Sequence, residues 1–177
     1  MKTKDIKTKV KEYFFLHPTV KLRVRHIERE LKVPLPSVIR YTKELEQERI
    51  LKRTEIANIT LYSSDRTSKI YLLEKKLFNI HQLHASGLLD FLVEELSNPT
   101  IAVFGSYARG EDTEESDIDL YIETHSKKKI NLEKYEKALQ RKIQLFIYKN
   151  IRELKNKDLA NNILNGIRIN GFMDVFT

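Results

Sequence analysis

Two short segments constrain this chain more than any other feature. Residues 103–110 read VFGSYARG, in which an apolar run ends at Gly105 and Ser106. Such a run predicts a buried strand that turns sharply into a short helix. Residues 116–122 read SDIDLYI, so that apolar residues alternate with Asp117, Asp119 and a tyrosine. The period of two in a strand predicts that both aspartates lie on one face, side by side.

Two adjacent carboxylates indicate a cation site. Like charges held this close repel each other, and a divalent ion offsets the repulsion. Mg²⁺ takes oxygen ligands, needs few of them from the protein, and shares its other positions with water and substrate phosphates. The Gly105-Ser106 turn adds a phosphate-binding half, because glycine lets the backbone approach closely and the N–H groups of a following helix can cradle a phosphate. The alternative is a surface turn followed by a strand with a polar outer face.

The combination resembles the signature of the DNA polymerase beta-type nucleotidyltransferases, in which a Gly-Ser turn is followed by an Asp-x-Asp strand. Gly-Ser-Tyr-Ala-Arg-Gly resembles the minimal nucleotidyltransferases, the small prokaryotic branch of that family. The resemblance implies that Gly105 and Ser106 bind the phosphates of a nucleoside triphosphate. It also implies that Asp117 and Asp119 are catalytic and hold Mg²⁺, or Mn²⁺ in its place. A hydroxyl nucleophile would attack the α-phosphorus and release pyrophosphate.

Two positions near this motif decide how far the resemblance extends. Arg109 lies one turn along the helix from Ser106, so it can reach the triphosphate or pair with the acidic loop 111–115. Active members of the family usually carry a third carboxylate on the next strand, and strand alternation assigns that position to Gln144. Glutamine is neutral, and its carbonyl can contact a metal but cannot act as a base at pH 7, which predicts that one metal binds while the second is weakened. Five other carboxylates could substitute only if the loop folds over the site: Glu111, Asp112, Glu114, Glu115 and Glu123.

The net charge of +7 is concentrated in the first part of the chain. Residues 1–72 hold 17 Lys and Arg against 9 Asp and Glu, whereas residues 73–177 hold 15 against 16. Such an asymmetry favours an anionic partner for the first part.

The same first part carries helical patterns over residues 4–16 and 24–31 and from Pro36 onward, with a turn at 32–34. Apolar segments at 50–53 and 59–62 predict two strands around a turn at 54–58. Pattern and order resemble the winged helix-turn-helix domains of prokaryotic transcription regulators.

That resemblance implies that the third helix enters the major groove of DNA while the hairpin wing follows the backbone. The exposed candidates for base contact are Ser37, Arg40, Tyr41 and Lys43, and those for phosphate contact are Lys52, Arg53 and Arg66. The alternatives are a solvated basic face, or a module that docks a protein or forms a dimer. Because winged-helix regulators often pair to read two half-sites, a homodimer is favoured.

The expected fold class is α+β. A winged helix-turn-helix domain over 1–72, mostly α with a β-hairpin wing, precedes a helical connector over 73–86. A small α/β nucleotidyltransferase-like domain with a mixed sheet then occupies 87–177. Its expected elements are helices at 87–97, 131–140 and 150–165, a short helix after Phe104, and strands at 100–104, 117–123, 142–148 and 167–175. Asn165 and Gly166 are expected to cap the helix before the last strand.

Several residue types exclude other functions. The absence of cysteine removes disulfides, thiolate catalysis and cysteine-ligated zinc. His81 and His84 lie three residues apart without a third ligand nearby, so they are expected to be packing or solvent histidines. The basic run 127–129 is either solvated or a phosphate contact. No apolar run approaches the roughly 18 residues that span a bilayer, and the chain starts without an apolar signal core, which favours a cytoplasmic protein without membrane contact.

Two classes of function remain. The first is an enzyme that transfers AMP or another nucleoside monophosphate to a protein, a nucleic acid or a small molecule, while the basic module binds that target or an operator. The second is a non-catalytic winged-helix regulator whose degenerate transferase domain senses a nucleotide or mediates assembly.

Overall fold

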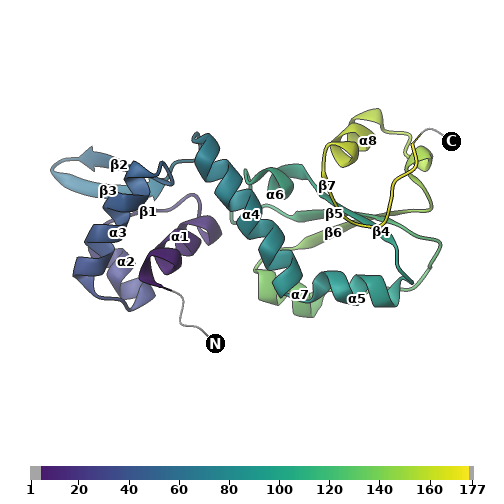
Figure 1. Ribbon diagram of the computed structural model, residues 1–177, viewed down its shortest axis with the longest axis horizontal. Helices are drawn as coiled ribbons and strands as arrows, with labels where there is room; N and C mark the ends of the chain where they lie inside the picture. Colours follow the sequence, from purple (N-terminus) through teal and green to yellow (C-terminus); the bar gives the residue numbers. More distant parts are fainter. Residues whose placement is uncertain (1–4, 176–177) are drawn as a thin grey trace. The chain divides into compact units, whose positions relative to one another are not determined.

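The computed structural model describes residues 5–175 and divides into two compact units (Figure 1). The first unit is Met1–Phe78 and the second is Asn79–Thr177. The boundary falls inside one long helix, α4 (Lys69–Ala85). None of the helices in the described range is long and apolar enough to cross a membrane.

The first unit is built from three helices and a small antiparallel sheet. Its elements before α4 are α1 (Ile6–Leu16), β1 (Lys21–Leu22), α2 (Val24–Leu31), α3 (Leu35–Gln47), β2 (Leu51–Ile56) and β3 (Ile59–Ser64). The strand order is β1-β3-β2. The hairpin is longer and its turn tighter than the sequence predicts. Only Ala57 and Asn58 form the turn, both with positive φ, because a two-residue turn of this hand matches the twist of the paired strands.

Backbone conformation explains the turn between α2 and α3. Lys32 ends α2 in the left-handed region, with φ of 51°. Pro34 precedes α3, so that Leu35 rather than Pro36 is its first residue. Both prolines lie where a helix needs no backbone N–H donor, since the first-turn N–H groups have no partner within the helix.

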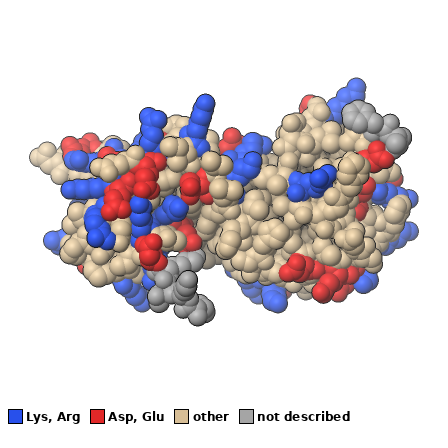
Figure 2. Space-filling model, in the orientation of Figure 1, with Lys and Arg blue, Asp and Glu red and all other residues tan. Residues whose placement is uncertain are grey.

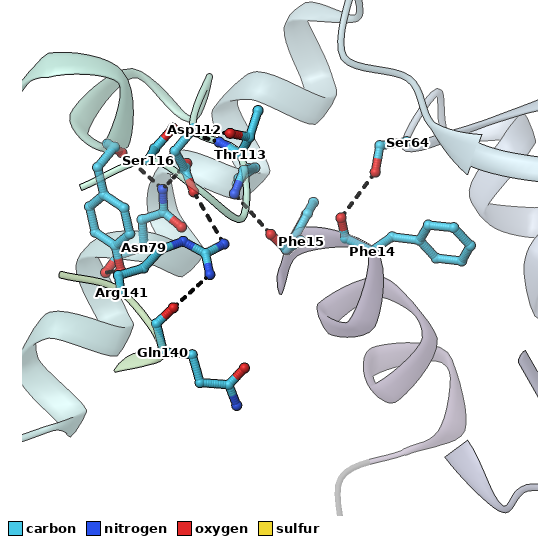
Figure 3. A network of polar contacts seen from close by, with 11 residues as sticks. Phe14, Phe15, Ser64, Asn79, Asp112, Thr113, Ser116, Gln140 and Arg141 are labelled. Atoms are coloured by element: carbon cyan, nitrogen blue, oxygen red, sulfur yellow. Dashed lines mark hydrogen bonds and ion pairs between the residues drawn. The ribbon is translucent and has the colours of Figure 1, made fainter. Parts of the chain in front are cut away.

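Two polar side chains complete the C-terminal end of α1. The last carbonyls of a helix have no partner within it, and here they are buried. Ser64 Oγ donates to the Phe14 carbonyl at 3.0 Å, and Lys75 Nζ donates to the Phe15 carbonyl at 2.9 Å (Figure 3). The cation of Lys75 also interacts favourably with the negative end of the helix dipole. The side chain of Lys75 is therefore buried in the first unit for a structural reason.

The second unit is a mixed four-stranded sheet with helices on both faces (Figure 1). After α4 its elements are α5 (Leu88–Glu95), β4 (Thr100–Phe104), α6 (Gly105–Arg109), β5 (Ile118–Glu123), α7 (Glu133–Leu139), β6 (Ile143–Tyr148), the 3₁₀ helix η1 (Ile151–Glu153), α8 (Lys157–Leu164) and β7 (Ile167–Asn170). The strand order is β6-β5-β4-β7, with β5 and β6 parallel and the other pairs antiparallel.

Alternation in β5 supplies two separate cores. Ile118, Leu120 and Ile122 pack with residues of α5 and α7 on one face of the sheet. Tyr121 is fully buried on the other face, where Ile163 of α8 covers it. Strand alternation puts Tyr121 on the same face as Asp119, and it is buried there because α8 covers that part of the face.

The C-terminal segment differs from the sequence prediction in two ways. The last strand ends at Asn170 rather than at 175, and Gly171 follows it with φ of 71°. Asn165 caps α8, but the glycine after it has a different role from a left-handed cap. A Cβ at Gly166 would lie 2.6 Å from the Val103 carbonyl oxygen, so glycine lets the chain pass close to β4.

Candidate functional site

The turn after β4 lies directly against the carboxylate of Asp119. Phe104 pairs with Asp119 across the antiparallel β4 and β5 strands. Gly105, the next residue, has φ of 72° and begins α6. A Cβ at Gly105 would lie 2.3 Å from Asp119 Oδ2. Glycine is therefore required twice at this position, once for its backbone conformation and once for the space that Asp119 occupies.

Replacing Gly105 by alanine should destabilise the protein more than the left-handed backbone alone explains. Gly87 offers a matched control, because its φ is 75° and a Cβ there meets nothing within 4 Å. We expect Gly87→Ala to lower the free energy of unfolding by about 1–2 kcal/mol. Gly105→Ala should lower it by about 1–3 kcal/mol more, the usual range for overpacking. Denaturant titration of both variants measures the difference, and equal losses would contradict the close contact with Asp119.

The two aspartates occupy different environments. Asp119 is half-buried within β5, whereas Asp117 is exposed and lies just outside the strand, which begins at Ile118. Burial raises the pKa of the Asp119 carboxyl, the negative charge of Asp117 raises that pKa further, and the charge of Arg109 opposes both effects. The ionised form of Asp119 is thus destabilised by its surroundings. A cation bound beside the two carboxylates would relieve that cost.

Gln144 lies next to Asp119 in the sheet. The parallel pairing of β5 and β6 puts these two residues in register, and Gln144 is exposed on the edge strand β6. Its neutral carbonyl oxygen can contact a cation but cannot take a proton from a nucleophile at neutral pH.

The other acidic residues named from the sequence do not add a third carboxylate to the pair of Asp117 and Asp119. Glu111 accepts from Arg109 at 2.6 Å, and Glu123 accepts from Tyr121 Oη at 2.8 Å at the far end of β5. Asp112 is buried, with 1% of its surface exposed. Within residues 5–175 no three His, Cys, Asp or Glu side chains come together in an arrangement that could hold a metal ion.

The donors present nevertheless fit a Mg²⁺ ion that takes part of its coordination from substrate. Asp117 and Asp119 provide carboxylate oxygens, which are the ligands that Mg²⁺ prefers. Mg²⁺ commonly binds through one or two carboxylates together with substrate phosphates and water, so a third protein carboxylate is not essential for binding. The absence of a carboxylate at position 144 bears on proton transfer more than on metal binding.

Arg109 pairs with the acidic loop in this structure. Its Nε lies 2.6 Å from Glu111 Oε2, and both side chains are about half exposed. An exposed ion pair of this kind is worth little, about 0–1 kcal/mol, and can exchange partners. The positive charge of Arg109 still lowers the pKa of Asp119, against the larger effect of burial.

A buried polar network lies behind the loop that leads to Asp117 (Figure 3). Asn79 Nδ2 donates to Asp112 Oδ1 at 2.7 Å and to the Tyr107 carbonyl at 2.9 Å. Arg141 Nη2 lies 3.9 Å from Asp112 Oδ2, and both side chains are almost fully buried. The sequence analysis missed Asn79 and Arg141. The sequence signal for Asn79 is its i, i+4 spacing with Tyr71, Lys75 and Leu83. The structure shows that all four residues are buried on α4.

An open cleft of about 560 Å³ borders Asp117. Residues 114–116 form one wall, and α7 and the segment 140–142 before β6 form the rest, including Glu136 and Lys142. A volume in this range is typical of small-molecule sites.

The residues predicted to contact DNA lie on α3, on β2 and after β3. Arg40 and Lys43 are exposed on α3, Lys52 and Arg53 are exposed on β2, and Arg66 is exposed beyond β3. Ser37 and Tyr41 are only partly exposed.

Several of these cations already contact neighbours. The Arg40 guanidinium stacks over the Tyr41 ring at 4.3 Å and approaches Glu44, and Arg53 pairs with Glu55. Figure 2 shows basic side chains of the first unit with acidic ones between them on the visible face.

The remaining candidates have ordinary surface environments. His81 and His84 are exposed on α4, and neither belongs to a metal-binding group among the residues that the structure describes. In the basic run 127–129, Lys128 pairs with Glu95 at 3.3 Å.

The comparisons with known proteins identify the class of the second unit. Residues 85–170 match the family model described as a nucleotidyltransferase domain. This span runs from the end of α4 to β7 and includes the glycine turn and both aspartates, so the match confirms the nucleotidyltransferase resemblance for this part of the chain.

One curated relative adds a more specific similarity. A protein of Methanocaldococcus jannaschii, named as a candidate protein adenylyltransferase, is 44% identical over 59 residues. The aligned segment is 29% of this chain and 59% of the relative, so this chain spans less than two thirds of that protein's length. No solved structure matches the chain.

Proposed function

We propose that the second unit is a Mg²⁺-dependent nucleotidyltransferase, which transfers a nucleoside monophosphate from a nucleoside triphosphate to a hydroxyl group. The observation that carries the proposal is the contact between the glycine turn and the aspartates. The Gly105 Cα faces Asp119 so closely that no side chain fits between them. A phosphate bound at the turn would therefore lie beside a cation bound at Asp119.

The residues of this chain would divide the work between binding and charge stabilisation. The backbone and hydroxyl of Gly105 and Ser106 would hold the β- and γ-phosphates, and Arg109 could leave Glu111 to contact the triphosphate. Asp117 and Asp119 would hold a divalent ion, which would supply positive charge to neutralise negative charge as it develops on the phosphates. The acceptor oxygen bonds to the α-phosphorus, the bond to the bridging oxygen breaks, pyrophosphate leaves, and the hydroxyl proton passes to solvent.

For the acceptor and the nucleotide we favour a protein and ATP. The support is the name of the Methanocaldococcus jannaschii relative, which describes adenylyl transfer to protein. The open cleft beside Asp117 offers room for an acceptor side chain.

The direct test is incubation of the full chain with each of four α-labelled nucleoside triphosphates, Mg²⁺ or Mn²⁺, and a lysate of the source cells. We expect label from ATP to become covalently attached to a protein band, and attachment to stop when EDTA is added. A γ-labelled triphosphate is the control, because nucleotidyl transfer leaves the γ-phosphate on pyrophosphate.

For the first unit we propose a winged helix-turn-helix that binds DNA. The order of α1, α2 and α3 followed by the β2–β3 hairpin supports it, as do the exposed cations of α3 and β2. The third helix would lie in the major groove and the hairpin along the backbone. DNA phosphates would then replace the carboxylates that now pair with Arg40 and Arg53. A homodimer that reads two half-sites is part of this proposal.

DNA binding should depend on the positive charges of α3. The double variant Arg40→Ala/Lys43→Ala should bind duplex DNA more weakly than the parent. If both residues meet phosphates, the slope of log affinity against log salt should fall by about 2, since each phosphate contact contributes about 1. The control is Lys149→Ala/Lys155→Ala, which removes the same charge from exposed positions of the second unit. Fluorescence anisotropy at several salt concentrations measures both. Equal affinities and equal slopes of the two double variants would favour a protein-docking or dimerisation role, whereas weaker binding by Arg40→Ala/Lys43→Ala with an unchanged slope would assign these two residues to base contact.

A second candidate function is a regulator without catalysis, in which the transferase domain senses a nucleotide. The observation that favours it is Gln144, which pairs with Asp119 where active members of the resembled family usually carry a carboxylate. Nucleotide binding without transfer, combined with a change in DNA affinity, would identify this function.

A further inference from the structure

Asp117 is the less constrained member of the aspartate pair. Asp119 is fixed on both sides by strand pairing, to Phe104 in β4 and to Gln144 in β6. Asp117 precedes β5 and takes part in neither ladder. Its position must therefore come from the loop before it and from the first hydrogen bond after it.

The loop before Asp117 is closed by its own hydrogen bonds. Thr113 N donates to Ser116 Oγ at 2.9 Å, and Ser116 N donates to the Thr113 carbonyl at 3.2 Å. Residues 113–116 thus form a compact turn directly before Asp117. This local turn fixes its own shape, but it does not fix where the turn lies relative to the sheet.

Asp112 ties the start of this turn to two other elements. Its carboxylate accepts from Asn79 of α4 at 2.7 Å and faces the guanidinium of Arg141 at 3.9 Å. Arg141 lies just before β6, and the next residue accepts a hydrogen bond from Ile118 N at 2.8 Å through its carbonyl. The chain on both sides of Asp117 is therefore connected to the buried pair of Asp112 and Arg141. Figure 3 shows this pair.

The same network also reaches the glycine turn. Asn79 Nδ2 donates to the Tyr107 carbonyl at 2.9 Å, and Tyr107 Oη donates to the Asn79 carbonyl at 3.3 Å. Tyr107 belongs to α6, two residues after Gly105. One buried amide thus fixes α6 and the loop to each other.

We propose that Asp112, with Asn79 and Arg141, is a positioning residue that sets the place of Asp117 relative to Asp119 and the glycine turn. The inference rests on the proposed metal-dependent function. A buried charge is costly unless it is paired and hydrogen-bonded, so the loop can occupy this place only with the network intact. Residues that orient metal ligands from outside the coordination shell typically contribute about 10–100-fold to metal affinity.

The test is a titration with Mn²⁺ in the presence of α,β-methylene ATP, in which electron paramagnetic resonance detects free Mn²⁺. Asp112→Asn should weaken Mn²⁺ binding by about tenfold. Asn79→Leu keeps the branched shape and the net charge but removes both amide contacts, and it should weaken binding in the same direction. Asp90→Asn is the matched control, because it removes one exposed negative charge from α5, outside the loop and the cleft. It should change the affinity less than about threefold, as expected for a solvent-screened charge.

The outcomes separate this inference from the proposed function. Parent-like Mn²⁺ binding by Asp112→Asn and Asn79→Leu, or an equal loss in Asp90→Asn, would overturn the positioning role while the metal site stands. If the parent itself binds no Mn²⁺ with the nucleotide analogue, the proposed function fails and the positioning role fails with it. Thermal melting of each variant identifies the temperature range in which that variant is folded and can be titrated. A network that only stabilises the fold would lower the melting temperature and leave the affinity of the folded protein unchanged.

Discussion

Replacing both Asp117 and Asp119 by asparagine is expected to abolish metal-dependent nucleotide binding and transfer while the fold is kept. Asparagine has almost the shape of aspartate but no charge, so it is a far poorer ligand for Mg²⁺. The pKa of Asp119 is raised above its ordinary value, which means that its ionised form costs stability in the folded protein at neutral pH. Neutralising the pair should therefore leave the melting temperature unchanged or higher.

A charge-matched control separates loss of the site from loss of charge. Asp90 and Asp158 are exposed in the first turns of α5 and α8, outside the two segments that form the candidate site. The variant Asp90→Asn/Asp158→Asn removes the same two charges from the second unit and should retain binding and transfer. Calorimetric titration with Mg²⁺ and a nonhydrolysable triphosphate measures the difference. Unchanged nucleotide affinity in Asp117→Asn/Asp119→Asn would exclude the aspartate pair as the metal site.

Replacing Gln144 by aspartate is expected to raise the rate of metal-dependent transfer, or to reveal transfer where the parent shows none. The pairing of β5 and β6 puts this side chain beside Asp119, so a carboxylate there could bind the cation and accept the proton of the nucleophile. A positioned general base typically contributes about 10²–10⁴-fold to a rate. Because Gln144 is exposed on an edge strand, the change should disturb no packing.

The control for this prediction is Gln144→Asn, which has the size and shape of the aspartate variant without its charge. A rate increase confined to Gln144→Asp would attribute the gain to the carboxylate. If the parent is active and Gln144→Asp slows it, the glutamine is a working part of the site and the interpretation of a degenerate site is wrong. If both variants match the parent while metal binding is intact, the two-aspartate site works as it stands.

Local patterns in the sequence were sufficient for the nucleotidyltransferase motif and for most elements. The strand that ends in Gly105 and the alternation around Asp119 follow from residue spacing, and the matched nucleotidyltransferase domain covers both. The helix at 24–31 and the helical connector expected at 73–86, which corresponds to most of α4, also follow from periodic spacing. These properties depend on residues close together in the chain, which is why the sequence reveals them.

Only the tertiary structure decided which surfaces are covered and which distant residues meet. Tyr121 alternates with the aspartates in sequence, yet α8 buries it, because period-two spacing assigns a side chain to a face and does not say what packs there. Gly105 meets Asp119, and Gly166 meets β4, through strand pairings between segments far apart in the chain. The buried contact of Asp112 with Asn79 and Arg141 joins three such segments. The sequence alone determined the chemistry available to this protein, and long-range packing determined where that chemistry is held.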